Sequence, residues 1–562
     1  MKKRTASSVR TRLPLEPGQA RRDASAHVPL TRPATGDHNL QDAAGQPTAV
    51  RVPSALAATV LLLLSGCLSS GGADGDDGAT DEGSALATGP TVFRGSVEFG
   101  ENTTALTDVD PALRFGTTGF AYVSAYGPEP NIGVTSSGAV FTSAFSTVMR
   151  STDGGLNWTA VHTHAIPLAA DTVGDNNDPM LWVDQWTDTV YNAPMFPILL
   201  CASIYASADD GETWPAAPTP ACGDAPFDHQ KLASGPAGPD LNPLAAVGLH
   251  PTVLYLCYNG IAVTNCAVSY DGGTTWPVNR PTVVNTVGFV VPQEQPTLLS
   301  PCFSGQNGHP TVSYQGVVAM LRTWSCTQPM LTYSTDSGLT WTNVAGPGFP
   351  GGPSDFLNTA NAHSIDPEVA FTPDGTMYVL FQSWDHRAYL ARTTDLGASW
   401  EGPFDVTPPG TSSTVFAALG AGSDGRVAMA FVAAGNVTGS SAGAPDDTRW
   451  HLHIVTSEDA ASEDPTFVAY QATPDADPVQ VGPIHQGGGS ANTRNLLDFI
   501  DGAVAPDGSF YVSFTDGCTP FNECAALPRA EQTTDFRGSA GAVAWLKGWS
   551  LLDEPRTGPL PL

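Results

Sequence analysis

Acidic residues precede prolines at the starts of three apolar segments, as Glu129-Pro130, Asp178-Pro179 and Asp366-Pro367. Carboxylates that converge can do two kinds of chemistry. A pair about 5 to 9 Å apart can act as the acid and the base or nucleophile of glycoside hydrolysis, and several carboxylates with backbone carbonyls can hold Ca²⁺, which takes six to eight oxygen ligands. The alternative is a rim of solvated turns that only begins strands.

Other common catalytic signatures are missing from the chain. It contains no His-Glu-x-x-His helix and no phosphate-binding loop. No motif requires a cofactor, and Ca²⁺ is the one ion that the acidic residues suggest. The sequence alone assigns neither catalytic residues nor metal ligands.

The elements that must position these residues are marked by a repeated octapeptide with the pattern Ser/Thr-x-Asp-x-Gly-x-x-Trp. The steps between successive tryptophans are 56, 62, 65 and 59 residues, a period that indicates one propeller blade per copy. In each copy the Asp side chain can accept backbone N–H bonds in a tight turn, Gly supplies a positive φ, and Trp packs against the sheet. The five copies begin at Ser151, Ser207, Ser269, Ser334 and Thr393.

This motif resembles the Asp-box of sialidase-like (BNR repeat) β-propellers. The resemblance implies an all-β chain with a single propeller over residues 93–550. It also implies that each box is the hairpin between the third and fourth strands of a blade, so that its residues are structural. These residues are Asp153, Trp158, Asp209, Trp214, Asp271, Trp276, Asp336, Trp341, Asp395 and Trp400.

Alternating apolar segments around the boxes predict about seven four-stranded blades, with six as the alternative. The segment 296–305 is the candidate inner strand of blade four, followed by the run that begins at Val317. Blade six carries a degenerate box over residues 456–467. In blades five to seven an Asp-Gly pair separates two apolar runs, which is typical of a hairpin.

The resemblance also indicates where a central pocket would lie. Residues just before each inner strand, and residues in the loops between second and third strands, should line it; Glu129 and Asp501 are among them. The predicted pocket set is Asp178, Asp228, His229, Glu294, Asp366, Glu368, Asp385, His386, Arg387, Arg494 and Asp498. Typical sialidase activity is not expected, because no Phe/Tyr-Arg-Ile-Pro motif is present to supply the first of the three arginines that clamp the sugar carboxylate.

The N-terminal part contains an export signal. Residues 52–64 are apolar but too short to span about 30 Å of hydrocarbon. The following Leu64-Ser65-Gly66-Cys67 resembles a lipobox, which predicts a lipoprotein signal peptide over 51–66 and lipidation at Cys67; the alternative is an ordinary signal peptide. Residues 1–50 are expected to be a disordered leader or a mis-assigned start, residues 67–92 a Gly/Ser/Asp-rich tether, and residues 551–562 a C-terminal tail.

The cysteines indicate disulfides, and the net charge limits the class of partner. The eight cysteines after Cys67 form four local groups, which favours four local disulfides over a zinc site. The chain has 24 Lys and Arg against 55 Asp and Glu, which argues against a nucleic-acid partner. The predicted pairs are Cys201 with Cys222, Cys257 with Cys266, Cys302 with Cys326, and Cys518 with Cys524.

Together these features predict a monomeric protein exported to the cell surface and anchored by lipid to the outer side of the membrane. We expect it to bind a glycan or another extracellular ligand at a central acidic pocket. A glycoside hydrolase or lyase of sialidase-like fold is the alternative, and a surface scaffold for protein contacts is the second, because this fold is used by enzymes and binders alike.

Overall fold

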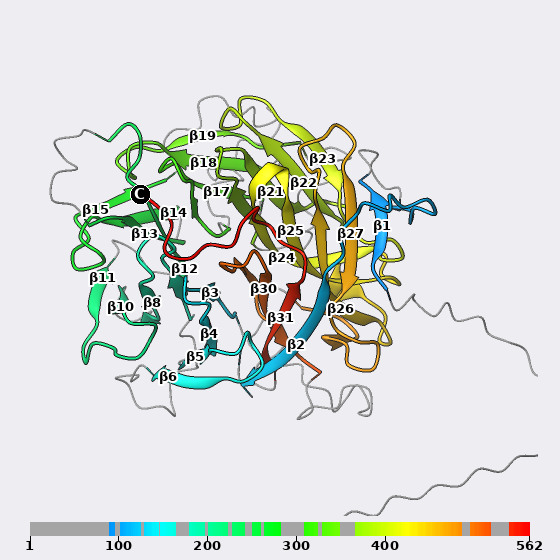
Figure 1. Ribbon diagram of the computed structural model, residues 1–562, viewed down its shortest axis with the longest axis horizontal. Coiled ribbons are helices and arrows are strands. Elements are labelled where there is room, and N and C mark those ends of the chain that lie inside the picture. Colours follow the sequence, from blue (N-terminus) through cyan, green and yellow to red (C-terminus); the bar gives the residue numbers. More distant parts are fainter. Residues whose placement is uncertain are drawn as a thin grey trace, which may run out of the picture. The chain divides into compact units, whose positions relative to one another are not determined.

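The apolar runs beside each Asp-box form antiparallel strands, and four such strands make one blade. The computed structural model describes residues 89–95, 102–124, 127, 129–144, 147–163, 179–196, 201–222, 228–241, 250–259, 264–282, 308–323, 329–348, 366–485, 495–518 and 539–562. All of them belong to one compact unit, Ser84–Leu562. In this unit the strands form seven sheets, so the prediction of an all-β, seven-bladed propeller is confirmed and the six-bladed alternative is wrong (Figure 1).

The first four blades follow the order of the chain, from the innermost to the outermost strand. Blade two also has a short strand, β9 (Met195–Phe196), that pairs with β10. The strands are β3 (Ile132–Val134), β4 (Val140–Ala144), β5 (Thr147–Ser151) and β6 (Thr159–Thr163) in blade one; β7 (Leu181–Val183), β8 (Val190–Asn192), β10 (Cys201–Ser207) and β11 (Thr219–Cys222) in blade two; β12 (Asp228–Gly235), β13 (Val253–Asn259), β14 (Thr264–Ser269) and β15 (Val278–Pro281) in blade three; β16 (Thr311–Val312), β17 (Val318–Arg322), β18 (Met330–Ser334) and β19 (Thr342–Ala345) in blade four.

The last three blades include both ends of the propeller. The only helical turns among the described residues are two short 3₁₀ segments, Ser423–Gly425 and Ser441–Gly443. The strands are β20 (Glu368–Phe371), β21 (Met377–Gln382), β22 (Ala388–Thr393) and β23 (Glu401–Asp405) in blade five; β24 (Ser413–Ala421), β25 (Val427–Ala434), β26 (Arg449–Ser457), β27 (Thr466–Gln471), β28 (Gln480–Val481) and β1 (Thr91–Arg94) in blade six; β29 (Asp501–Val504), β30 (Phe510–Asp516), β31 (Ala540–Lys547) and β2 (Thr117–Ser124) in blade seven.

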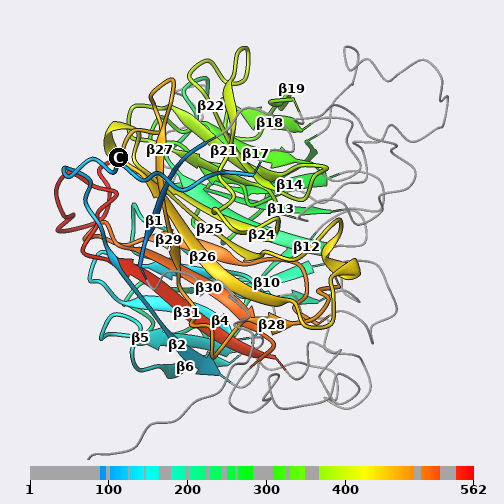
Figure 2. The ribbon, with the colours of Figure 1, turned by 90° about the vertical axis from the view of Figure 1, so that its right-hand side faces the viewer.

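The ring is closed by strands from the two ends of the propeller. Strand β2 pairs antiparallel with β31, so an N-terminal strand forms the outer edge of the blade whose other strands are C-terminal. Figure 2 shows β2 and β31 side by side, and β1 next to β27 in blade six. Breaking the ring therefore requires separation of β2 from β31, which costs a complete strand–strand ladder.

One strand differs from the prediction. The inner strand of blade four is β16, Thr311–Val312, rather than the segment 296–305. Residues 283–307 lie outside the described part of the chain. The segment 296–305 suggested the wrong strand, whereas β16 has only two residues and gives a weak alternation signal.

The five Asp-boxes form the predicted hairpins between third and fourth strands. In each box the Asp Oδ1 accepts the Ser or Thr hydroxyl at 2.8–2.9 Å and a backbone N–H at 2.8–2.9 Å. The box glycines have φ between 75° and 93°, a region that other residues rarely adopt. In the degenerate box of blade six, Asp459 accepts the Ser457 hydroxyl and the Thr466 N–H in the same way. These aspartates therefore stabilise turns.

Two of the predicted disulfides are present in the described residues. Cys201–Cys222 joins β10 to β11, and Cys257–Cys266 joins β13 to β14. Cys518 is also disulfide-bonded, whereas Cys302, Cys326 and Cys524 lie outside the described residues, as does Cys67. Within the described part of the chain, no helix is long and apolar enough to cross a bilayer.

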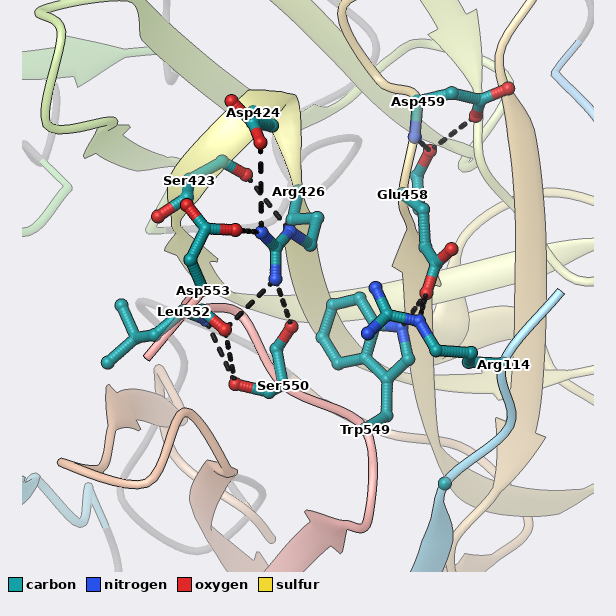
Figure 3. Close-up of polar contacts among 12 residues, drawn as sticks. Arg114, Ser423, Asp424, Arg426, Glu458, Asp459, Trp549, Ser550, Leu552 and Asp553 are labelled. Carbon is teal, nitrogen blue, oxygen red and sulfur yellow. Dashed lines mark hydrogen bonds and ion pairs between the residues drawn. The ribbon is translucent and has the colours of Figure 1, made fainter. Parts of the chain in front are cut away.

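The C-terminal segment is bound to the blades. The Arg426 guanidinium donates to the carbonyls of Ser550 and Leu552 at 3.1 and 3.0 Å and pairs with Asp553 (Figure 3). Beside it, Glu458 accepts the Trp549 indole N–H at 3.1 Å and the Arg114 Nε–H at 2.9 Å.

Beyond Asp553 the tail reaches two further blades. The Arg556 N–H donates to the Pro506 carbonyl at 2.7 Å and the Leu560 N–H to the Gln185 carbonyl at 2.8 Å. In Figure 1 this red segment crosses in front of the inner strands. The tail thus links blades seven, six and two.

Candidate functional site

Three polar residues from blades three, five and seven meet where their inner strands begin. His229 Nε2 lies 2.9 and 3.0 Å from the two carboxylate oxygens of Asp366. On its other side, His229 Nδ1 lies 3.9 Å from the Asp498 carboxylate. All three side chains are buried, so the reading of these positions as solvated turns does not apply to them.

A bulge at the start of β12 aims the basic side chains. The pairing of β12 with β13 shifts between Asp228 and Lys231, and His229 has a φ of 54°, in the left-handed region. Lys231 Nζ then lies 3.0 Å from Asp366 Oδ2 and 2.9 Å from the centre of the Phe499 ring. A carboxylate and an aromatic face therefore compensate this fully buried ammonium group.

A second acid–histidine pair lies beside the first. His309 Nδ1 is 2.6 Å from Glu368 Oε1, and both side chains are buried. The rings of His229 and His309 each contact Phe499 edge to face, with centroids 5.4 Å apart. Phe499 therefore packs between the two pairs and holds both imidazoles in place.

The environment gives neighbouring acids opposite protonation states. Burial raises the pKa of Asp366, but the positive charges of His229 and Lys231 outweigh burial and leave that pKa below its ordinary value. Burial, together with the charges of Asp501 and Asp366, holds the pKa of Glu368 well above its ordinary value. The same surroundings therefore favour the carboxylate form of Asp366 and the protonated form of Glu368.

The two histidines and Asp501 are also perturbed. Burial lowers the pKa of His229, but the Asp366 carboxylate outweighs burial and raises that pKa overall. For His309, burial and the charge of Lys231 lower the pKa well below its usual range. Burial raises the pKa of Asp501 to about 6. The cluster thus combines acids whose pKa values are shifted in opposite directions with a histidine whose pKa is lowered, an arrangement typical of general acid–base sites.

A cavity of about 130 Å³ adjoins these residues and is lined by all seven inner strands. Glu368, His309 and Asp501 contribute to its wall. The rest of the wall is mainly aliphatic, with four aromatic side chains, Trp182, Trp186, Tyr314 and Phe371, and Leu552, Arg556 and Leu560 of the tail complete it. The cavity therefore combines flat apolar faces with a few polar groups, as small-molecule sites usually do.

Three of the buried residues could hold a metal ion. The ligand atoms of Glu129, His229 and Asp498 all lie within 4.8 Å of one another. Asp366 bonds the other ring nitrogen of His229, which is how metal-binding imidazoles are usually oriented. An imidazole with two carboxylates suits a transition metal better than Ca²⁺, which prefers oxygen ligands alone.

Comparison with known proteins agrees with this architecture. Residues 228–473 match the family model of a BNR repeat-like domain. The propeller thus contains a BNR repeat-like domain. No curated protein matches this chain.

Solved structures similar to the BNR-repeat propeller are remote. A protein of unknown function from Dyadobacter fermentans is 14% identical over 78% of this chain and 100% of that one, with a TM-score of 0.35. The BP39L lectin from Burkholderia pseudomallei is 12% identical over 72% and 93%, with a TM-score of 0.38. An intramolecular trans-sialidase from Ruminococcus gnavus is 14% identical over 78% and 96%, with a TM-score of 0.33. At these values the matches carry no argument about a ligand.

Three other predicted residues, Asp385, His386 and Arg387, have partners away from this cluster. Arg387 Nε lies 2.5 Å from Asp405, and its Nη1 donates to Asn102 at 2.9 Å. Asp385 accepts the Tyr389 hydroxyl at 2.6 Å, and His386 has a φ of 64° in the same turn. These contacts tie the 385–387 turn to β23 and to Asn102, and none of its three residues lines the cavity.

The other predicted residues lie outside the described part of the propeller. They are Asp178, Glu294 and Arg494, together with the side chain of Asp228. The described residues that the prediction and the structure both bring together are His229, Asp366, Glu368 and Asp498, with Glu129 and Asp501 beside them.

Sequence reasoning missed Lys231, His309 and Phe499. His309 stands before Pro310 at the start of β16, the same position that Asp366 occupies before Pro367, but it is not acidic. Lys231 is one of only two lysines after Cys67, a rarity that could have marked it. Phe499 carried no signal, because an apolar residue before a strand is ordinary.

Proposed function

We propose that this protein is an exported, cell-surface lipoprotein that binds a glycan or a similar extracellular ligand in the central channel of its propeller. The observation that carries the proposal is the cavity along the inner strands, in which Glu368, His309 and Asp501 lie with aromatic side chains. Sugar rings stack on aromatic faces and hydrogen-bond to carboxyl groups, so this lining suits them.

The size of the cavity limits the ligand. Its volume is about 130 Å³, close to that of an engineered cavity of about 150 Å³ that holds one benzene ring. We therefore expect the channel to take a single ring, such as the terminal unit of a glycan, with the rest of the ligand outside.

Export is supported by the disulfides Cys201–Cys222 and Cys257–Cys266, since such bonds persist in oxidising compartments. The lipid anchor at Cys67 remains a proposal from the lipobox resemblance. No cofactor is required for binding of this kind.

A glycosidase or lyase is the second candidate, and one observation favours it. Within one cluster the pKa of Glu368 is raised, whereas the pKa values of Asp366 and His309 are lowered. Pairs of titratable groups with pKa values pushed apart are typical of acid–base catalysis. In such a reaction Glu368 would be the proton donor.

A glycan array probed with the purified propeller tests the proposal. We expect specific binding that is lost in Glu368→Gln and Asp501→Asn and retained in the matched controls Glu463→Gln and Asp447→Asn, whose side chains are exposed. Binding unchanged in both channel variants would contradict the channel as the site. Incubation of each bound glycan with the protein, followed by product analysis, separates an enzyme from a binder.

A further inference from the structure

Arg322 is a buried cation at the junction of blades three and four. It ends strand β17 and pairs with Met330, the first residue of β18, whereas the Asp-box of this blade begins at Ser334, the last residue of β18. Arg322 therefore lies at the end of the blade opposite its Asp-box. Its exposed fraction is 0%.

The bonding capacity of this arginine is almost unused. A guanidinium has five N–H donors and no acceptor. Nη2 of Arg322 donates to the Thr282 hydroxyl at 2.7 Å, while Nε and Nη1 are buried without a hydrogen-bond partner. Thr282 is itself fixed in blade three, where its hydroxyl donates to the Thr264 carbonyl at 3.1 Å.

The other buried cations of the described residues have carboxylate partners. Lys231 lies 3.0 Å from Asp366, Arg387 lies 2.5 Å from Asp405, and Arg426 pairs with Asp553. Among the described ion pairs none involves Arg322, whose one bond goes to a neutral hydroxyl. A buried charge without a counter-charge is strongly destabilising, so Arg322 differs from the other buried cations of the described residues.

We propose that Arg322 binds an oxyanion, a carboxylate or sulfate group, at the junction of blades three and four. This site is separate from the central channel and goes beyond the function proposed for it. Such a group would bind one edge of the guanidinium, with one oxygen accepting from Nε or Nη1 and the other from the second N–H of Nη2, and would neutralise the charge, as in planar bidentate pairs of arginine.

The guanidinium remains charged under ordinary conditions. Burial lowers the pKa of Arg322 to about 9, which leaves it protonated at neutral pH. Because the side chain has no exposed surface, the anion must enter during a local opening of the chain. Binding is therefore measured at equilibrium, after incubation.

Equilibrium dialysis of the whole protein with radiolabelled sulfate, at constant ionic strength set by sodium chloride, tests this site. We expect one saturable sulfate site in the wild-type protein. Arg322→Met should weaken it about tenfold or more, since hydrogen bonds to charged groups contribute about 1.5–3 kcal/mol. Arg280→Met, which removes an exposed arginine of β15, should leave it unchanged.

Thermal denaturation shows whether Arg322→Met is still folded, so that a loss of sulfate binding can be assigned to the lost guanidinium. Sulfate should raise the Tm of the wild-type protein to a plateau, and Arg322→Met without sulfate should be at least as stable as the wild type, because an uncompensated buried charge has been removed. Glucuronate, acetate and glucose in the same assay distinguish a sugar acid from a free anion: stabilisation by glucuronate but by neither acetate nor glucose identifies an acidic glycan. Absence of a saturable site for both sulfate and glucuronate, or equal binding by Arg322→Met, overturns the proposal, whatever the channel binds.

Discussion

Replacement of Asp366 by Asn tests the buried charge network most sharply. Asp366 bonds His229 at 2.9 Å and pairs with Lys231 at 3.0 Å, and the exposed fractions of the Asp366 and Lys231 side chains are 0%. Removing one partner of a buried pair typically costs about 3–5 kcal/mol. Asn can keep one hydrogen bond and Phe499 still faces the ammonium group, so we expect the lower end, about 3 kcal/mol.

Equilibrium urea denaturation followed by tryptophan fluorescence measures this loss. The double variant Asp366→Asn/Lys231→Met should recover most of the lost free energy of unfolding, because it no longer buries an ammonium group without a counter-charge. Asp464→Asn is the matched control: Asp464 is 73% exposed and pairs with exposed Arg94, so the change should cost less than about 1 kcal/mol. The reasoning fails if Asp366→Asn costs no more than this control, or if the second substitution recovers nothing.

Four further predictions follow from particular contacts. Burial raises the pKa of Asp516 well above its ordinary value, so the folded state holds a proton that the unfolded state releases. The contribution of Asp516 to the free energy of unfolding should therefore fall as pH rises above about 4. Asp516→Asn should remove this pH dependence, as measured by denaturation curves at several pH values. Asp271→Ala removes bonds to Ser269 and Thr275 and should lower the free energy of unfolding by about 1–3 kcal/mol; a change below about 0.3 kcal/mol would contradict its role in the turn. Arg426→Met should release the C-terminal segment, seen as faster cleavage there in limited proteolysis, with unchanged cleavage as the contrary result. Cys67→Ser should move the protein from the membrane to the soluble fraction of the cell, and equal membrane association would exclude lipidation.

The blades were predictable because their signals are local. Each Asp-box carries its own turn chemistry, in which Asp153, for example, accepts bonds only from residues within four positions. The short inner strand Thr311–Val312 was missed because two residues give no period, and the longer segment 296–305 was chosen instead.

The site was only partly predictable, because its contacts are long-range. His229 and Asp366 are 137 positions apart. Both were predicted at the channel because each stands just before or at the start of an inner strand. Lys231 and His309 were missed because the prediction searched for acids, whereas buried acids require cations and donors beside them. Arg387 looked similar in sequence, but its partner Asp405 on β23 of the same blade keeps it in a local network.

The most direct test of the account is a crystal structure of the propeller with the glycan that binds best on the array. The account predicts one sugar ring in the central channel, stacked on an aromatic side chain such as Trp182 or Trp186 and within hydrogen-bond distance of Glu368 or Asp501. A ring bound only on the outer surface, with the channel residues unchanged, would contradict it.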